Sequence, residues 1–281
     1  MKPTYVSRVD RDHPSCLIFL VDQSNSMNDP MAGSKQPKHL AVAGILNGLL
    51  YELILRSVKS HAEGPRPYFA VAVVGYSTNE DGDPVISNGL HPPLDAHPVV
   101  WTPDLAAHPL RVEQRPAPSG TGQVSAPVWI EPYAAGGTPM CAAFDRAGRI
   151  AKSWVDAYPT SFPPIVVNLT DGEATDGDPG PWAERIRALS NDDGAVLLFN
   201  LSISSDSTAP LLFPSSSDRL VDRPARKLFE MSSELPAFML DAARAQGHQV
   251  DAGARGFGFN ADIRSVMTFL NVGTAVGKVL R

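Results

Sequence analysis

Four continuous apolar runs divide the chain, and each predicts a β-strand that is buried on both faces. The runs are rich in branched and aromatic residues, which is typical of strands in a parallel sheet covered by helices. They end at polar or turn-forming residues, so each run has the length of a single strand. The four runs span 16–21, 68–75, 164–169 and 195–201, and a shorter fifth strand is expected at 256–259.

Segments with helical spacing of apolar residues lie between these runs. From Lys38 to Lys59, leucine and isoleucine recur at three- and four-residue steps. Thr138 and Pro139 resemble the N-cap and first residue of a helix that continues to about Val155. Further helices are expected at 182–189, at 225–245 and at 261–270. Alternating strands and helices predict an α/β fold: a three-layer, doubly wound, mostly parallel sheet with helices on both faces.

Residues 77–135 break this alternation. Ten prolines fall between Pro84 and Pro132, and proline in a central strand removes a ladder hydrogen bond, so most of this region is predicted to be loop or edge structure. Edge strands or a hairpin are expected at 98–101 and 127–130. We interpret the region as a proline-rich insertion in a single domain of residues 1–281, whose core spans about 16–270. A mobile linker is the alternative, although the aromatic residues of the insertion favour packing.

Composition and charge narrow the function classes. The chain is 43% hydrophobic and 19% charged, as in globular proteins, and its net charge of -6 argues against a nucleic-acid partner. Without a continuous apolar run of spanning length, no membrane partner is expected. The segment 1–14 lacks the basic-then-apolar order of a signal peptide. Cys16 and Cys141 are interpreted as small core residues in a reducing compartment, so a cytoplasmic location is expected.

Acidic and hydroxyl side chains follow the predicted strands. Asp22, Ser24 and Ser26 come after the first strand, Asp171 comes after the third, and Thr138 begins a helix. Open α/β sheets bind ligands at the carboxyl ends of their strands, so these five side chains are predicted to meet at one rim. Hard oxygen ligands favour Mg²⁺, with Mn²⁺ or Ca²⁺ as alternatives. Two carboxylates balance the charge of one divalent cation, which leaves it able to take an oxygen from a partner.

The order of these segments resembles a known family. The Asp-x-Ser-x-Ser segment at 22–26, Gly-Gly-Thr at 136–138 and Leu-Thr-Asp-Gly at 169–172 are similar to the metal-ion-dependent adhesion site of von Willebrand factor type A domains. The resemblance implies one divalent cation held by the same five residues, which lie in three loops of a doubly wound sheet. Asn25 stands where the family usually has glycine, and no ligand is lost by this difference. The resemblance covers roughly 16–270, with 77–135 longer than usual.

The resemblance implies a non-enzymatic interaction module, in which a protein partner donates an Asp or Glu side chain to the bound cation. The chain looks most similar to intracellular bacterial members such as the tellurium-resistance-associated proteins, which implies an adaptor or scaffold in a stress-response, defence or assembly system. The partner system could include a separate ATPase, kinase or phosphatase.

Two alternatives stay open at this point. One is a non-catalytic subunit of an ATP-driven chelatase- or chaperone-type complex, and the other is a metal-dependent hydrolase. The acidic segment 173–178 lacks the spacing of an EF-hand and is interpreted as a solvated rim.

Overall fold

The main sheet has eight strands and is mostly parallel. The computed structural model describes residues 5–7, 9–60, 62–116, 121–205, 209–220 and 222–274. Within them the strand order is β3-β2-β1-β7-β8-β10-β9, and β4 also pairs with β2. The strands are β1 (Ser15–Asp22), β2 (Phe69–Thr78), β3 (Pro84–Asn88), β4 (Val100–Trp101), β7 (Ile165–Thr170), β8 (Leu197–Ile203), β9 (Leu211–Leu212) and β10 (Phe257–Ala261). The central five are parallel to their neighbours, whereas β3, β4 and β9 are antiparallel additions at the edges.

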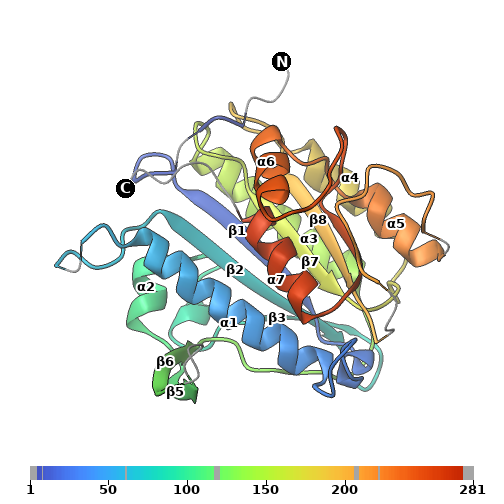
Figure 1. The fold of residues 1–281 in the computed structure, drawn as a ribbon, viewed down its shortest axis with the longest axis horizontal. Coiled ribbons are helices and arrows are strands. Elements are labelled where there is room, and N and C mark those ends of the chain that lie inside the picture. The colour runs from blue at the N-terminus through green and yellow to red at the C-terminus, as the bar shows by residue number, and fades with distance from the viewer. Residues whose placement is uncertain are drawn as a thin grey trace.

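Helices cover both faces of the sheet (Figure 1). One face packs against α1, α2, α6 and α7, and the other against α3, α4 and α5. The helices are α1 (Lys38–Ser57), α2 (Thr102–Ala107), α3 (Met140–Ala157), α4 (Gly180–Ala188), α5 (Arg223–Met231), α6 (Ala237–Ala245) and α7 (Ile263–Gly273). The predicted fold class, a doubly wound α/β sheet with helices on both faces, is confirmed.

The central strand β1 shows why the apolar runs are continuous. Every residue of β1 is buried, and successive side chains point to opposite faces of the sheet. Phe19 therefore belongs to the core beneath α1 and α7, whereas Ile18 belongs to the core beneath α3. If polar and apolar residues alternated along β1, the polar side chains would all point into one of the two cores. Only a continuous apolar run supplies apolar side chains to both cores.

Strand order reverses beside β1. The chain runs from β1 through α1 to β2 on one side, and later strands β7, β8 and β10 lie on the other side. This arrangement makes β1 and β7 the topological switch point, where loops at the carboxyl ends diverge and leave a crevice. Register pairs Val21 with Leu169, so Asp22 and Thr170 end adjacent strands at the same level.

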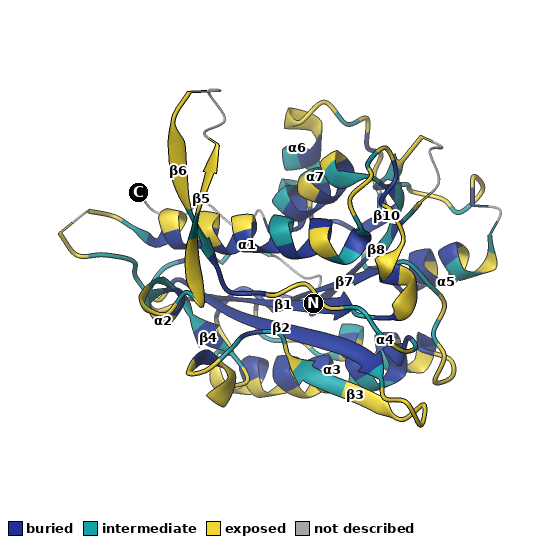
Figure 2. Cartoon of the chain, turned by 90° about the horizontal axis from the view of Figure 1, so that it is seen from below, coloured by how far each residue is buried: buried dark blue, intermediate teal, exposed yellow. Residues whose placement is uncertain are grey.

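The proline-rich insertion packs onto this framework. The strands β3 and β4 pair with β2, and Trp129 is buried with its indole N–H donating to the Leu105 carbonyl at 2.7 Å. Asn47 of α1 fixes the segment further: its side-chain oxygen accepts from the backbone N–H of Trp129 and Ile130, and its amide donates to the Ile130 carbonyl. A second sheet, β5 (Arg111–Pro116) with β6 (Gln123–Val128), stands away from the body as an exposed hairpin (Figure 2).

Some elements differ from the sequence prediction. The expected helix 225–245 is two helices, α5 and α6. The backbone is extended from Ser232, where Ser233 and Leu235 donate to the carbonyls of Leu198 and Ala254, and Pro236 has no N–H to continue a helical ladder. The helix α2 within the insertion was not predicted; its six residues are too few to show a helical period.

The helix α1 lies where the sequence predicts it and is unusually apolar. Among the described residues it is the one helix whose 20 residues and mean hydropathy of 1.4 would suffice for a membrane crossing by length and composition. In this structure, 56% of that stretch is buried inside the protein, as in the core helix of a globular domain.

Asn47 offers a test of how the insertion is held. Replacing Asn47 with Ala removes the partner of two buried backbone N–H groups, so the free energy of unfolding should fall by about 2–4 kcal/mol in urea denaturation. Glu52→Ala, at an exposed position of the same helix, should change it by less than about 0.5 kcal/mol. Equal effects of the two substitutions would show that Asn47 does not anchor the insertion.

Candidate metal site at the sheet rim

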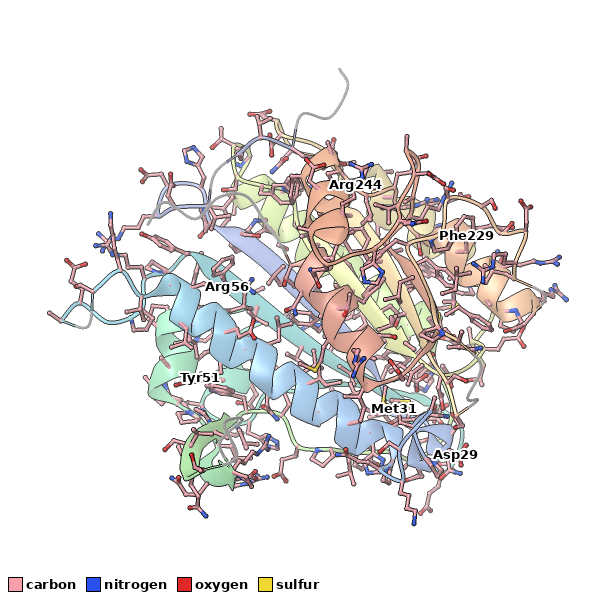
Figure 3. The ribbon with its side chains drawn as sticks, in the orientation of Figure 1. Asp29, Met31, Tyr51, Arg56, Phe229 and Arg244 are labelled. Atoms are coloured by element: carbon pink, nitrogen blue, oxygen red, sulfur yellow. The ribbon has the colours of Figure 1, made fainter. Side chains whose placement is uncertain are left out.

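The first loop begins with a buried carboxylate. Asp22 is the last residue of β1 and is fully buried. Its Oδ1 accepts the backbone N–H of Ser24 at 2.8 Å, and its Oδ2 accepts the Thr170 hydroxyl at 2.6 Å. The short 3-10 helix Asn25–Asn28 follows. Figure 3 labels Asp29 and Met31 farther along this loop, beside the first turn of α1. The Asp22 carboxylate is therefore held in place by its own loop and by the end of the neighbouring strand β7.

Hydroxyl groups connect the first loop to the third. The Ser26 hydroxyl donates to Asp171 Oδ1 at 2.7 Å, and the Ser24 and Ser26 hydroxyl oxygens are 3.0 Å apart. Because Ser26 gives its one hydroxyl proton to Asp171, Ser24 is the donor in the serine pair. Asp171 directly follows β7, so the two loops meet because their strands are neighbours. Three of the five predicted side chains thus form one hydrogen-bonded line.

The second loop is tied to the first through its backbone. Ala135 donates its N–H to the Gln23 carbonyl at 2.7 Å, and Asn25 donates to the Gly136 carbonyl at 2.8 Å. Gly136 has φ +72°, and a Cβ there would lie 2.2 Å from the Thr78 carbonyl oxygen. Only glycine accommodates this close approach.

Thr138 follows in this second loop and is only 5% exposed. Its backbone pairs with Thr175 in the third loop, by two hydrogen bonds of 3.0 and 2.9 Å. Its hydroxyl has no hydrogen-bond partner within the part of the chain that the structure describes. A Cβ at Gly172 in the third loop would lie 3.8 Å from this hydroxyl oxygen. The hydroxyl oxygen thus lies beside the loop that carries Asp171, and it is not among the fully buried, unpartnered side-chain atoms of the described residues.

The predicted N-cap role of Thr138 is wrong. The helix α3 begins at Met140 after Pro139 and has no side-chain cap from its own flanking residue. Asp176 takes that role from the third loop, accepting the backbone N–H groups of Cys141 and Ala142 at 3.0 and 2.9 Å. A carboxylate there also complements the positive end of the helix dipole. The Thr138 hydroxyl is therefore not needed by the helix.

The same contacts revise the interpretation of 173–178 as a solvated rim. Asp176 caps α3, and Asp178 forms an ion pair with Lys227 of α5 at 2.8 Å. Asp178 also accepts the backbone N–H of Gly180 at the start of α4. These acids are exposed, but they hold helix ends together beside the site. A cap supplied from across the chain has no local sequence pattern, which is why sequence reasoning missed it.

Lys38 is the residue of this rim that sequence reasoning did not place. It is the first residue of α1, and its ammonium donates to Asp171 Oδ2 at 2.7 Å. The two side chains are 6% and 1% exposed. Sequence reasoning used Lys38 only as the start of a helical pattern. Nothing local signals its contact, because its partner lies 133 residues away.

Burial dominates the electrostatics of Asp22. Desolvation raises its pKa to about 6, although hydrogen bonds from Thr170 and Ser24 oppose the shift. The nearby negative charge of Asp171 raises it further. Ionised Asp22 is therefore costly without a compensating positive charge, which a bound divalent cation would supply.

The donor set fits a small divalent cation. The oxygens of Ser24, Ser26 and Asp171 are 2.7 and 3.0 Å apart, as in hydrogen bonds, and adjacent ligands ~2.1 Å from an octahedral Mg²⁺ lie ~3.0 Å apart, so these oxygens are close enough to share one ion. The Thr138 hydroxyl supplies a further oxygen on a neighbouring loop. No cluster of three or more His, Cys, Asp or Glu side chains suited to a metal occurs among the described residues, because this site has two carboxylates and three hydroxyls.

Comparison with known proteins gives no family assignment. No protein-family model matches the chain, and no curated protein matches it. Among solved structures, manganese-loaded TRAP protein of Plasmodium vivax is 13% identical, with a TM-score of 0.42; the match covers 93% of this chain and 73% of that one. The pilus adhesin SpaC of Lactobacillus rhamnosus GG is 10% identical, with a TM-score of 0.48; the match covers 96% of this chain and 32% of the adhesin. The chain thus spans about a third of the adhesin's length.

The raised pKa of Asp22 predicts a pH-dependent cost in metal-free protein. The folded pKa lies above the unfolded value of 3.8, so stability is complete below about pH 4 and is lost as pH rises through about 6. In chelator at pH 7, Asp22→Asn should therefore raise the free energy of unfolding, by roughly 2–3 kcal/mol. The gain should vanish near pH 4 in urea titrations. Asp241→Asn, which is exposed, should behave as wild type, and a gain independent of pH would contradict this account.

Proposed function

We propose that this chain is a metal-dependent protein-interaction module that binds an acidic side chain of a partner protein through one divalent cation. The observation that carries the proposal is the line of oxygens from Ser24 through Ser26 to Asp171, which joins the first and third loops beside the buried carboxylate of Asp22. Two buried carboxylate side chains, Asp22 and Asp171, lie at this rim with one buried ammonium group to offset them, which favours the binding of a cation.

The five residues of the proposed site contribute two kinds of ligand, charged carboxylates and neutral hydroxyls. Asp22 and Asp171 carry the negative charge that offsets a divalent cation, whereas Ser24, Ser26 and Thr138 add neutral oxygens. A bound cation would supply an electrophilic centre able to accept one more oxygen ligand. Because the protein contributes only two carboxylates, the charge of the cation is balanced but not exceeded, and an external Asp or Glu can take the remaining coordination position. Mg²⁺ is the proposed ion, with Mn²⁺ or Ca²⁺ as alternatives.

The finer parts of the proposal rest on the motif resemblance. The three segments occur in the order of a von Willebrand factor type A adhesion site, and the first and third follow the adjacent strands β1 and β7. We propose accordingly a non-enzymatic adaptor or scaffold in a bacterial stress-response, defence or assembly system, working in the cytoplasm. The proposed partner is a protein, without nucleic acid or membrane.

The partner system is proposed to include a separate ATPase, kinase or phosphatase. In the chelatase- or chaperone-type alternative, the same site would transmit partner binding to an ATPase on another chain. Co-purification with an ATPase distinguishes that version from a passive scaffold.

Asp22→Ala tests the ion site directly. Removing this carboxylate should abolish Mg²⁺ or Mn²⁺ binding in titration calorimetry, because one of two charged ligands is lost. Circular dichroism should remain that of the wild type. Asp178→Ala is the matched control, since Asp178 lies on the same rim but pairs with Lys227, and its metal affinity should be unchanged. Metal binding that survives in Asp22→Ala would refute the assignment.

Partner capture tests the use of that ion. Immobilised wild-type protein should retain its partner in Mg²⁺ and release it in chelator, and readdition of Mg²⁺ should restore capture. The Asp22→Ala protein should capture little under either condition, whereas Asp178→Ala should behave as wild type. Capture that is indifferent to chelator would favour a metal-independent surface.

A further inference from the structure

A buried ammonium group lies against the proposed ion site. Lys38 is 4% exposed, although lysine is rarely buried unless it is paired. Its Nζ donates to Asp171 Oδ2 at 2.7 Å and to the Ser26 carbonyl at 3.4 Å. It lies 3.9 Å from Asp29, whose side chain is 63% exposed. Asp171 is thus the one buried counter-charge of Lys38 among the described residues.

The two oxygens of Asp171 serve opposite sides of this arrangement. Oδ1 accepts the Ser26 hydroxyl on the side of the proposed ligands, and Oδ2 accepts Lys38. A cation that binds the Ser24–Ser26 side therefore approaches Oδ1 without removing Lys38. The ammonium and the cation would share one carboxylate.

The positive charge is the property that requires explanation. Lys38 begins α1, where the helix dipole is positive and repels an ammonium group. Removing the ammonium from water adds a further cost. Its counterweight is the buried negative charge of Asp171, so the ammonium acts on the electrostatics of the site itself.

We infer that Lys38 is a resident cation that weakens divalent-ion binding and keeps the loaded site net positive for an acidic partner group. This inference rests on the proposed function. Asp22, Asp171 and Lys38 together carry -1, so a divalent cation brings the site to +1; without Lys38 it would be neutral. The same charge thus lowers affinity for the ion and raises affinity for a carboxylate on the ion.

Calorimetry with Mn²⁺ tests whether the charge of Lys38 weakens ion binding. Lys38→Gln removes the charge and keeps an amide donor for Asp171, and Lys38→Met is a second neutral variant should the first fail to fold. Either should bind Mn²⁺ at least about tenfold more tightly than wild type, since like charges this close repel strongly when buried. Lys38→Arg, which keeps the charge, and Lys35→Met, at an exposed position of the preceding loop, should stay within about threefold of wild type.

Acetate, a simple carboxylate, tests whether the charge of Lys38 raises the affinity of the loaded site for an acidic group. Water-proton relaxation reports the displacement of water from bound Mn²⁺ by acetate. At saturating Mn²⁺, the neutral variants should need at least about threefold more acetate than wild type for half-displacement, because the loaded site has lost its net positive charge. If wild type and the neutral variants need equal acetate concentrations for half-displacement, the claim that Lys38 favours an acidic partner group is overturned.

The outcomes separate the two proposals. If wild type binds Mn²⁺ and the neutral variants bind no more tightly, the role of Lys38 is overturned and the ion site stands. Binding by the neutral variants alone would overturn the proposed function and establish Lys38 as the group that excludes the ion. Binding by neither would overturn both.

Discussion

The parallel pairing of β1 between β2 and β7 is the constraint on which the rest of the structure depends. Because β1 is hydrogen-bonded on both sides and buried on both faces, it has one register and one direction. The chain leaves it toward β2 and returns on its other side as β7, so the loops after β1 and β7 diverge from adjacent strand ends. The 2.6 Å hydrogen bond from Thr170 to Asp22 joins those two ends.

Charges gathered at this switch point determine its chemistry. Placing Asp22 at the end of a buried strand removes water from its carboxylate and raises its pKa to about 6. A second carboxylate, Asp171, adds repulsion, which Lys38 offsets in part at 2.7 Å. The metal-free rim is therefore a place where negative charge is concentrated at a cost in stability. Binding of a cation would offset that cost, so the same burial that destabilises the free protein favours the ion.

The other acids of the rim hold the framework in place. Asp176 satisfies the first N–H groups of α3, and Asp178 connects the third loop to α5 through Lys227. Because the cap of α3 comes from another loop, Thr138 keeps its hydroxyl free at the same helix end. Carboxylates close together in sequence thus have different roles, and their hydrogen-bond partners distinguish them.

The sequence by itself determined the layers of the fold and the composition of the rim. Continuous apolar runs predicted strands buried on both faces, and the turn residues after them placed Asp22, Ser24 and Ser26 in a loop at a carboxyl end. These features are local, because strand burial and loop position depend on residues within a few positions of one another.

Only the tertiary structure decided the contacts between distant segments. It assigned the cap of α3 to Asp176 instead of Thr138, and it brought Lys38 to Asp171 across 133 positions. It also divided 225–245 into two helices and anchored the insertion through Asn47. Each of these contacts joins residues that no periodicity relates. Their partners are set by the order of strands and the packing of helices on them, and these follow from the whole chain.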